Sequence, residues 1–170
     1  KPVILHLISD LDIGGTEKML AELVKHLSKE KYRILVCSIK PKGLVAQEIQ
    51  AIKKIRLVSL NVRTKLDISA FFKLYRLLKK ERVVILQTYL FFDNLLGRVV
   101  GRMACVPIII SGQRYLYEGE PLWRILIDRW TARLSNLIIS NSTAAKQSLM
   151  WQRIGKQKIQ VIYNGKDFSL

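Results

Sequence analysis

Three short segments of the chain combine glycine and small polar residues in patterns that suit the binding of an anion or a sugar. The first, Gly14-Gly15-Thr16-Glu17, follows an apolar run and opens a segment with helical periodicity. Glycines let the backbone approach a ligand closely, and the first N–H groups of a helix have no partner within it. We expect an anion site at this helix N-terminus, while a tight turn without a ligand is an equally good interpretation of the spacing alone.

The other two segments lie late in the chain. Ser140-Asn141-Ser142 follows an apolar run at 137–139, and small polar residues between a strand and a capped helix are by themselves ordinary. The segment Val161-Ile162-Tyr163-Asn164-Gly165-Lys166-Asp167 has the pattern of a last strand and an Asn-Gly turn, which is typical of a hairpin. No partner strand follows it in the sequence, so we expect the molecule to continue beyond this turn.

Short β-branched runs alternate with amphipathic stretches, and these elements must position the three segments. We expect strands at 3–8, 34–39, 56–60, 83–87, 107–111, 137–140 and 160–163, and helices at 16–29, 44–53, 67–81, 93–104, 121–135 and 142–152, the last capped by Ser142. Most of the strands are continuously apolar, as strands covered on both faces are. The alternation predicts one Rossmann-like, doubly wound α/β domain over 1–170, with a mostly parallel sheet of about seven strands and helices on both faces.

Ligands of doubly wound sheets bind beyond the carboxyl ends of the strands, here the loops at 9–16, 88–92, 111–120 and 140–142. The first loop lacks the G-x-G-x-x-G dinucleotide fingerprint and the G-x-x-x-x-G-K-[ST] phosphate loop. No acidic residue clearly ends the second expected strand, where a ribose-binding carboxylate would stand. A nicotinamide-dependent enzyme is therefore disfavoured.

The composition is that of a basic globular protein. Its 29 Lys and Arg residues outnumber 13 Asp and Glu residues, and the net charge of +16 attracts polyanions such as nucleic acid, anionic lipid or phosphorylated substrates. No apolar run reaches the length of about 18 residues that a membrane span needs. The sequence shows no nucleic-acid-binding motif, so a non-enzymatic basic module that binds nucleic acid or an anionic membrane is an alternative supported by charge alone.

In this order and spacing, the three segments resemble the N-terminal half of the family-4 glycosyltransferases of the GT-B fold, with their G-G-x-E turn, serine-containing helix start and V-I-x-N-G-V-D ending. The resemblance spans nearly the whole chain. It implies an enzyme of the hexosyltransferase type, in which two Rossmann-like domains transfer a sugar from a nucleotide-sugar donor, usually with retention and with no metal or other cofactor. It also implies that this chain is the acceptor-binding half, inactive alone, and that the C-terminal nucleotide-sugar-binding domain is absent from it.

The resemblance also implies roles for individual residues. It places Gly14, Gly15, Thr16 and Glu17 facing the donor diphosphate, Tyr89, Gln113, Arg114, Ser140 and Asn141 in contact with acceptor or sugar, and Asn164 and Gly165 at the interdomain hinge. Many relatives carry a His in the segments that here read Gln87-Thr88-Tyr89 and 111–114, so no catalytic residue is assigned. The polar side chains of these segments either bind sugar or phosphate or only cap strand ends.

The expected helix at 121–135 carries a stripe at helical spacing, formed by Trp123, Leu126, Ile127, Trp130 and Leu134, with Arg124, Asp128 and Thr131 opposite. A basic helix with tryptophans can lie on an anionic membrane, and the membrane-facing candidates are Trp123, Arg124, Trp130 and Arg133. Packing of the stripe on the sheet is the commoner arrangement. We expect a cytoplasmic protein, peripheral on the inner face of the cell membrane, that binds a glycan or lipid-linked acceptor of polysaccharide biosynthesis and no specific nucleic acid.

Overall fold

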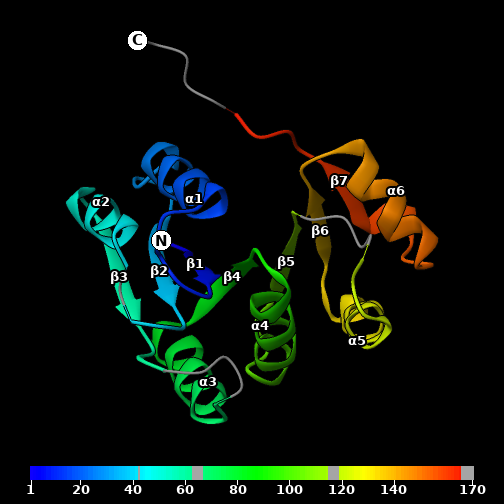
Figure 1. Ribbon diagram of the computed structural model, residues 1–170. Helices are drawn as coiled ribbons and strands as arrows, with labels where there is room; N and C mark the ends of the chain where they lie inside the picture. Colours follow the sequence, from blue (N-terminus) through cyan, green and yellow to red (C-terminus); the bar gives the residue numbers. More distant parts are fainter. Residues whose placement is uncertain (42, 63–66, 115–118, 166–170) are drawn as a thin grey trace.

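The structure, a computed structural model, describes residues 1–41, 43–62, 67–114 and 119–165. Within them one sheet contains seven strands, β1 (Val3–Ile8), β2 (Arg33–Ser38), β3 (Ile55–Ser59), β4 (Val83–Thr88), β5 (Ile108–Gln113), β6 (Leu137–Ser140) and β7 (Ile159–Val161). Their order is β3-β2-β1-β4-β5-β6-β7 (Figure 1). Every neighbouring pair is parallel, so the doubly wound fold is confirmed with a sheet that is parallel throughout rather than mostly parallel.

The described helices are α1 (Gly15–His26), α2 (Val45–Ala51), α3 (Ser69–Glu81), α4 (Phe91–Met103), α5 (Leu122–Thr131) and α6 (Thr143–Trp151), with 3-10 turns at Ala132–Leu134 and Lys156–Lys158. Each matches a predicted helix, with ends that differ by a few residues. The predicted cap at Ser142 is confirmed, because its hydroxyl accepts a hydrogen bond of 3.1 Å from the Ala145 N–H. Before α3, the Asp67 carboxylate accepts one of 2.8 Å from the Ser69 N–H.

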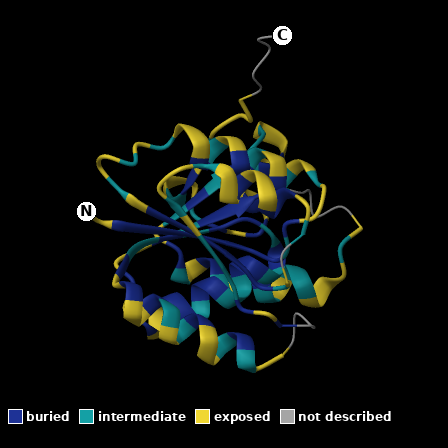
Figure 2. Ribbon diagram, turned by 90° about the vertical axis from the view of Figure 1, so that its left-hand side faces the viewer, coloured by how far each residue is buried: buried dark blue, intermediate teal, exposed yellow. Residues whose placement is uncertain are grey.

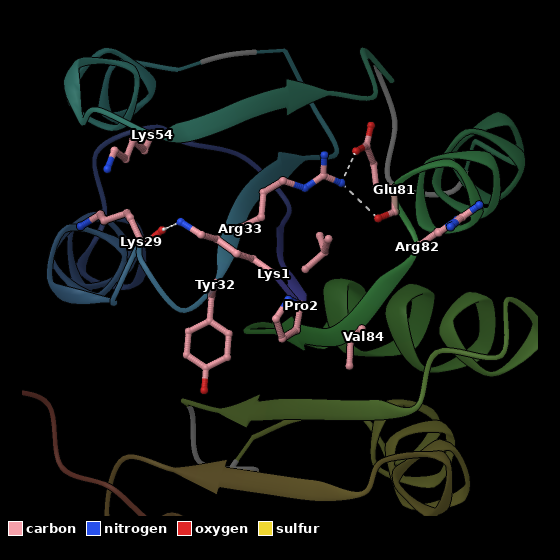
Figure 3. Close-up of a pocket in the computed structure, with 10 residues that line it drawn as sticks. Lys1, Pro2, Lys29, Tyr32, Arg33, Lys54, Glu81, Arg82 and Val84 are labelled. Atoms are coloured by element: carbon pink, nitrogen blue, oxygen red, sulfur yellow. Dashed lines mark hydrogen bonds and ion pairs between the residues drawn. The ribbon is translucent and has the colours of Figure 1, made fainter.

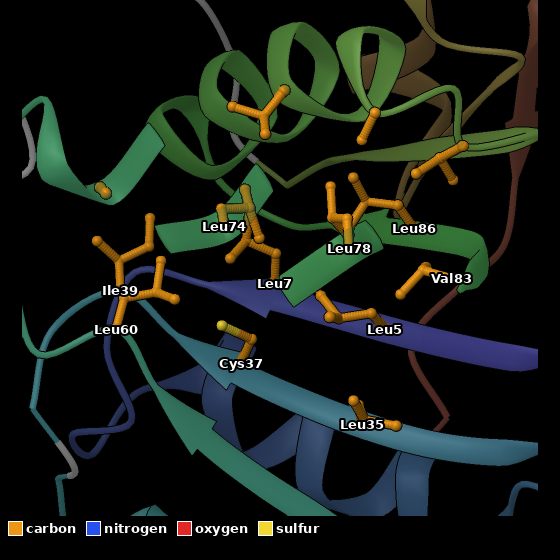
Figure 4. Packing of buried hydrophobic residues seen from close by; sticks show 14 of the residues in the cluster. Leu5, Leu7, Leu35, Cys37, Ile39, Leu60, Leu74, Leu78, Val83 and Leu86 are labelled. Carbon is orange, nitrogen blue, oxygen red and sulfur yellow. The ribbon is translucent and has the colours of Figure 1, made fainter. Parts of the chain in front are cut away.

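The helices cover the two faces of the sheet unequally. On one face α3 and α4 pack against Leu5, Leu35 and Leu86 (Figure 4), and α5 and α6 extend this layer over Ile138 and Ile159. On the opposite face only α1 and α2 are present among the described residues, and they lie over the β1–β3 side (Figure 1). The strands between these layers are mostly buried, while the helices turn exposed residues outward (Figure 2).

The opposite face has no described helix beyond β4. Strand register places Gln87 beside His6, and the alternation of side chains continues this face to Ile110 and Ile139. These strand residues beyond β1 are half-buried, whereas Val36 under α1 is fully buried. We call this region the open sheet face and define it by Ile85, Gln87, Ile110, Leu137 and Ile139. It is an apolar surface on strands of the kind that folded proteins usually cover on both sides.

A buried ion pair sets the orientation of α5. Arg98 of α4 is fully buried and pairs with Asp128 of α5, which is also buried. The Arg98 Nε donates to the hydroxyls of Ser111 and Ser135, at 2.9 and 3.0 Å. Removing one partner of such a pair leaves an uncompensated buried charge and costs about 3–5 kcal/mol. The hydrophobic pattern of the helix gave no sign of this pair, because it placed Asp128 on the solvent side.

The apolar stripe of α5 consequently points outward. Trp123, Leu126 and Trp130 are 53%, 49% and 63% exposed. The interpretation in which this stripe packs on the sheet is therefore wrong. Arg124 lies away from the stripe, because it pairs with Glu120 and its guanidinium sits 4.4 Å from the centre of the Phe91 ring. Arg133 lies at the stripe, with its guanidinium 4.7 Å from the centre of the Trp130 ring.

Candidate functional site

The carboxyl ends of the strands bring together the loops in which the sequence predicts a site. Strands β1 and β4 are neighbours, and the strand order reverses between them. Doubly wound folds bind their ligands at such a reversal, outside the carboxyl ends of the strands. Helix α1 begins at Gly15, shortly after β1 ends at Ile8, so its N-terminus lies at this edge. The helix N-terminus for which the sequence predicts an anion site therefore lies at the edge where such folds bind ligands.

The glycines at the start of α1 act differently from the predicted tight turn. Gly14 has an extended backbone, with φ −157° and ψ 164°, which any residue can adopt. Its lack of a side chain matters for packing, because a Cβ there would collide with the Glu17 carboxylate. At Gly15 nothing lies within 4 Å of an added Cβ, so this residue borders open space. The N–H groups of Gly15, Thr16 and Glu17 begin the helix and have no acceptor within it.

A pocket of about 550 Å³ lies beside α1, and we call it the cleft pocket. Three parts of the chain line it. These are α1 with Met19, Glu22, Leu23 and His26, the sheet side with Gln87, Arg114 and Ile139, and the segment after β7 with Ile162, Tyr163, Asn164 and Gly165. Gly15 lies one turn before Met19 on the same face of the helix. The cleft pocket therefore begins about one helical turn from the open helix end, at the margin of the open sheet face.

Arg114 brings a positive charge to the cleft pocket. One Nη donates a hydrogen bond of 2.8 Å to the Asn164 Oδ1, and the other lies 3.3 Å from the Met19 Sδ, a weak acceptor. Its Nε is buried and has no hydrogen-bond partner among the described residues. Burial lowers the pKa of the guanidinium, and the nearby Tyr89 opposes this change. A guanidinium with these unused donors can still bind a carboxylate or phosphate.

Three of the five side chains predicted to contact acceptor or sugar are buried. Tyr89, Gln113 and Ser140 are fully buried, whereas Arg114 and Asn141 are half-buried. The Ser140 hydroxyl donates to the Ser142 carbonyl at 2.8 Å, so it holds the end of its strand. Among the predicted contact residues, only Arg114 and Asn141 therefore have surface exposed in this structure.

The sequence interpretation gave no role to His6, the polar residue in the middle of β1. Its Nδ1 lies 2.6 Å from the Tyr89 hydroxyl, and its Nε2 is buried without a partner among the described residues. Burial lowers the pKa of His6 from 6.5 to about 4, so the imidazole is neutral at pH 7. The ring of Tyr89 in turn lies 5.5 Å from the Arg114 guanidinium. A contact path thus connects β1 to Asn164 through Tyr89 and Arg114.

A second buried network fixes the spacing of the strand ends. The Ser9 hydroxyl donates to the Asp93 carboxylate at the start of α4. The Thr88 hydroxyl donates to the Asn94 Oδ1 at 2.6 Å, and the Asn94 amide donates to the Gly112 carbonyl at 3.0 Å. A Cβ at Gly112 would lie 3.0 Å from the Thr88 carbonyl oxygen, so glycine permits a close approach of β4 and β5. This network connects the carboxyl ends of β1, β4 and β5 to the start of α4.

Another hollow, of about 600 Å³, lies at the opposite edge of the sheet (Figure 3). It contains Arg33, which donates to the Glu81 carboxylate at 2.7 Å, and the other oxygen of that carboxylate accepts from Arg56 at 2.8 Å. Lys54 pairs with Glu30 at 2.6 Å. Glu81 and Glu30 thus pair with some of the hollow's cations, while Lys29 and Arg82 also line it without an ion pair among the described residues, and the hollow lies away from the carboxyl ends of the strands. Because Glu81 at the end of α3 pairs with Arg33 of β2 and Arg56 of β3, we assign these three residues a structural role.

Comparison with known proteins gives a family and a set of similar folds. Residues 13–170 match the model of Glycosyltransferase Family 4. HepE from Anabaena, solved in complex with UDP and glucose, superposes with a TM-score of 0.81 at 16% identity, over 98% of this chain and 45% of that chain. The lipopolysaccharide outer core galactosyltransferase WaaB in its apo form superposes with a TM-score of 0.72 at 16% identity, over 99% of this chain and 47% of that chain. No curated protein sequence matches.

The same fold also occurs in a protein with a different activity. A UDP-N-acetylglucosamine 2-epimerase superposes with a TM-score of 0.72 at 16% identity, over 95% of this chain and 48% of that chain. Identities this low establish the fold and not the substrate. The chain spans slightly less than half the length of these solved structures, 45–48%. Its fold is that of one half of a GT-B protein.

Proposed function

The chain belongs to glycosyltransferase family 4, and we propose that it is the acceptor-binding half of an enzyme that transfers a sugar from a nucleotide-sugar donor to a glycan, lipid-linked or other small acceptor. The observation that carries this proposal is that the open helix end at Gly15 lies one turn before Met19, which lines the cleft pocket together with Arg114. The helix end at Gly15 suits an anion, and the cleft pocket offers a cation, Arg114, and apolar walls. A donor diphosphate and an acceptor would then meet along α1.

The chemistry follows from the groups at each end. When the bond between sugar and diphosphate breaks, negative charge develops on the departing diphosphate. The N–H groups of Gly15, Thr16 and Glu17, together with the positive end of the helix dipole, stabilise that charge without reorganising. Arg114 holds an anionic or hydroxyl group of the acceptor, and its bond to Asn164 couples this contact to the segment that we propose as the interdomain hinge.

We propose that the second wall of the donor site belongs to a C-terminal domain of the same polypeptide. Residues 1–170 alone then show no sugar transfer, because the diphosphate has only one wall of its site. Turnover of any nucleotide sugar by this fragment would contradict this division of labour.

We further propose that transfer proceeds with retention and without a metal ion. Within the described residues no group of three or more His, Cys, Asp and Glu side chains is placed to hold a metal. Helix N–H groups and arginine can supply the charge stabilisation that a metal would otherwise provide. Activity of the complete polypeptide should therefore survive a strong chelator, and the anomeric configuration of the product reports the stereochemistry.

The test of the site uses the complete polypeptide and a matched pair of variants. Gly15→Val fills the open space at the helix end, while Ala144→Val makes a similar change in the first turn of α6 at an exposed position. We expect Gly15→Val to lower kcat/KM for the donor at least tenfold with little change in Tm, and Ala144→Val to retain activity. Arg114→Met should raise the acceptor KM. Full activity of Gly15→Val would refute the proposed site.

We also propose that the protein is peripheral on an anionic membrane, with a lipid-linked acceptor. Support comes from the exposed stripe of α5 and the net charge of +16. No helix in the described part of the chain is long and apolar enough to cross a membrane. Vesicles rich in anionic lipid should bind the protein more strongly than neutral vesicles. Equal binding to both would remove this part of the proposal.

A further inference from the structure

A small basic pocket lies between the C-terminal ends of α5 and α6, with a volume of about 220 Å³. We call it the basic pocket and define it by four cationic residues that line it, Arg129, Arg133, Arg153 and Lys158. Among the described residues no carboxylate forms an ion pair with any of them. The pocket therefore concentrates positive charge that the rest of the described protein does not neutralise.

The cations of the basic pocket are partly held in place. The Lys158 ammonium donates to the backbone carbonyls of Arg133 and Ser135, each at 3.1 Å. The Arg133 guanidinium is stacked 4.7 Å from the centre of the Trp130 ring. Neither contact uses an anionic acceptor, so both groups keep their full charge and further N–H donors for a ligand.

We propose that the basic pocket binds the phosphate of an anionic phospholipid headgroup. Its volume of 220 Å³ is enough for a phosphate group and a few atoms on either side, since one water occupies about 30 Å³ of liquid. Arginine donates two parallel hydrogen bonds to phosphate oxygens, and charge-assisted bonds of this kind are about twice as strong as neutral ones. Three arginines and a lysine would therefore favour a phosphate whose negative charge is not offset by a cationic group in the same headgroup, as it is in phosphatidylcholine.

The residues next to the basic pocket favour a lipid over a soluble phosphate compound. Trp130, beside Arg129 in sequence, is 63% exposed, and Trp151, two residues before Arg153, is 89% exposed. Tryptophan is enriched at membrane–water interfaces, where its ring sits at the level of the headgroups. A soluble ligand gives no reason for apolar rings beside its pocket. The combination of cations and exposed tryptophans thus matches the surface of a membrane.

The position of the basic pocket gives α5 a defined role on that membrane. Helix α5 follows β5 and precedes β6, so it runs from the carboxyl edge of the sheet toward the opposite edge, where the basic pocket lies. With ten residues it is about 15 Å long. A headgroup bound at its C-terminal end, with the exposed stripe in the interface, keeps its N-terminal end and the carboxyl edge near the lipid. This inference deepens the peripheral-membrane part of the proposed function.

The test compares two double variants that remove the same charge. Arg133→Gln with Arg153→Asn removes two of the four cations of the basic pocket, and asparagine is chosen because residue 153 has a φ of 60°. Arg76→Gln with Lys80→Gln removes two exposed charges from α3. Each variant is made in the complete polypeptide, and its co-sedimentation is measured with phosphatidylcholine vesicles that contain or lack phosphatidylglycerol. We expect the pocket variant to lose at least tenfold in affinity for the anionic vesicles and the α3 variant to lose less than threefold.

Further arms identify the source of the phosphate. Inorganic phosphate and glycerol 3-phosphate should compete only well above millimolar concentration, and Trp151→Ala should weaken vesicle binding although all four cations of the basic pocket remain. Equal losses in the two double variants would reduce the effect to general electrostatics and overturn the inference. Competition by millimolar inorganic phosphate would assign the pocket to a soluble anion and overturn the inference. The inference would also be overturned if the pocket variant and the α3 variant differed as much in their affinity for a short DNA duplex as in their affinity for vesicles.

One readout separates this inference from the proposed function. Sugar transfer to a water-soluble acceptor analogue does not need a membrane, so it should be the same in the pocket variant and in the unmodified protein. If transfer is absent altogether, the proposed function fails while vesicle binding still tests the pocket. If transfer persists and the vesicle preference does not depend on the pocket, only this inference fails.

Discussion

The two halves of the sheet are built from similar strands but packed in different ways. Around β1 and β2, Val36 is buried under α1 and α2 on one face, and Leu35 is buried under α3 on the other. Around β5 and β6, Ile138 is covered by the layer of α5 and α6, while Ile110 and Ile139 on the opposite face are half-buried. A continuously apolar strand therefore does not establish that helices of the described residues cover both of its faces.

The boundary between these halves is also where the candidate site lies. His6 belongs to the covered half, and its register neighbour Gln87 belongs to the open sheet face. The cleft pocket uses Gln87 and Ile139 from the open sheet face and Met19 from the helix that covers the other half. The step from two helical layers to one thus creates the space beside α1 in which we place the acceptor.

The largest effect is expected from a pair of adjacent substitutions in β6. Ile138→Asp places a carboxylate in a fully buried cluster and should lower the free energy of unfolding by more than about 4 kcal/mol. Ile139→Asp changes the open sheet face and should cost about 1 kcal/mol or less. Urea unfolding followed by circular dichroism measures both. Similar losses would show that Ile139 is covered in solution, and dependence on protein concentration would identify a second copy as the cover.

The next effect is a dependence of stability on pH that arises from His6. The folded-state pKa of about 4 lies below the ordinary value of 6.5, so the unfolded chain binds the proton more readily in this interval. The stabilisation is complete above pH 6.5 and is lost as the pH falls through about 4, up to about 3 kcal/mol in all. Unfolding free energies of the unmodified protein and His6→Gln should therefore converge as the pH falls. A constant difference between them would contradict the assignment to His6.

The smallest effect contrasts two glycines. Gly112→Ala should cost about 1–2 kcal/mol, because its Cβ would crowd the Thr88 carbonyl even though β5 borders the open sheet face. Gly15→Ala meets no neighbour and should stabilise the chain by about 0.5 kcal/mol through the unfolded state. Thermal unfolding of both variants measures the difference. A loss of stability at Gly15 would mean that the space beside α1 is smaller than the structure shows.

Local patterns were sufficient to predict the framework. The apolar runs and helical periods indicated the strands and helices of a doubly wound sheet, and Ser142 was recognised as a cap because its chemistry is local. The loops at the carboxyl ends followed from topology. The start of α1 lies at this edge for the same reason, although Gly14 proved to be extended, and the anion site there stays a prediction.

Features that depend on contacts between residues far apart in the sequence could not be predicted from local sequence patterns. The orientation of α5 depends on Arg98, 30 residues before Asp128, and a hydrophobic stripe carries no information about such a partner. The burial of Tyr89 and Gln113 depends on how neighbouring strands end, not on their own sequence. The basic pocket joins residues of α5 to residues after α6, and in sequence these charges look like ordinary solvated ones. A polar residue within an apolar strand, as at His6, is the one signal that was present and unused.

The Arg98–Asp128 pair also acts as a choice between two rotations of one helix. Judged by hydrophobicity alone, α5 would turn its tryptophans to the sheet and its charged side to water. The buried pair excludes that alternative, in the way that a single buried polar contact can select one register of a coiled coil. Replacing both residues by apolar ones should let α5 roll inward, and a blue shift of tryptophan fluorescence without vesicles would report it. The outer surface of this protein is thus specified by two side chains that no solvent, lipid or sugar touches.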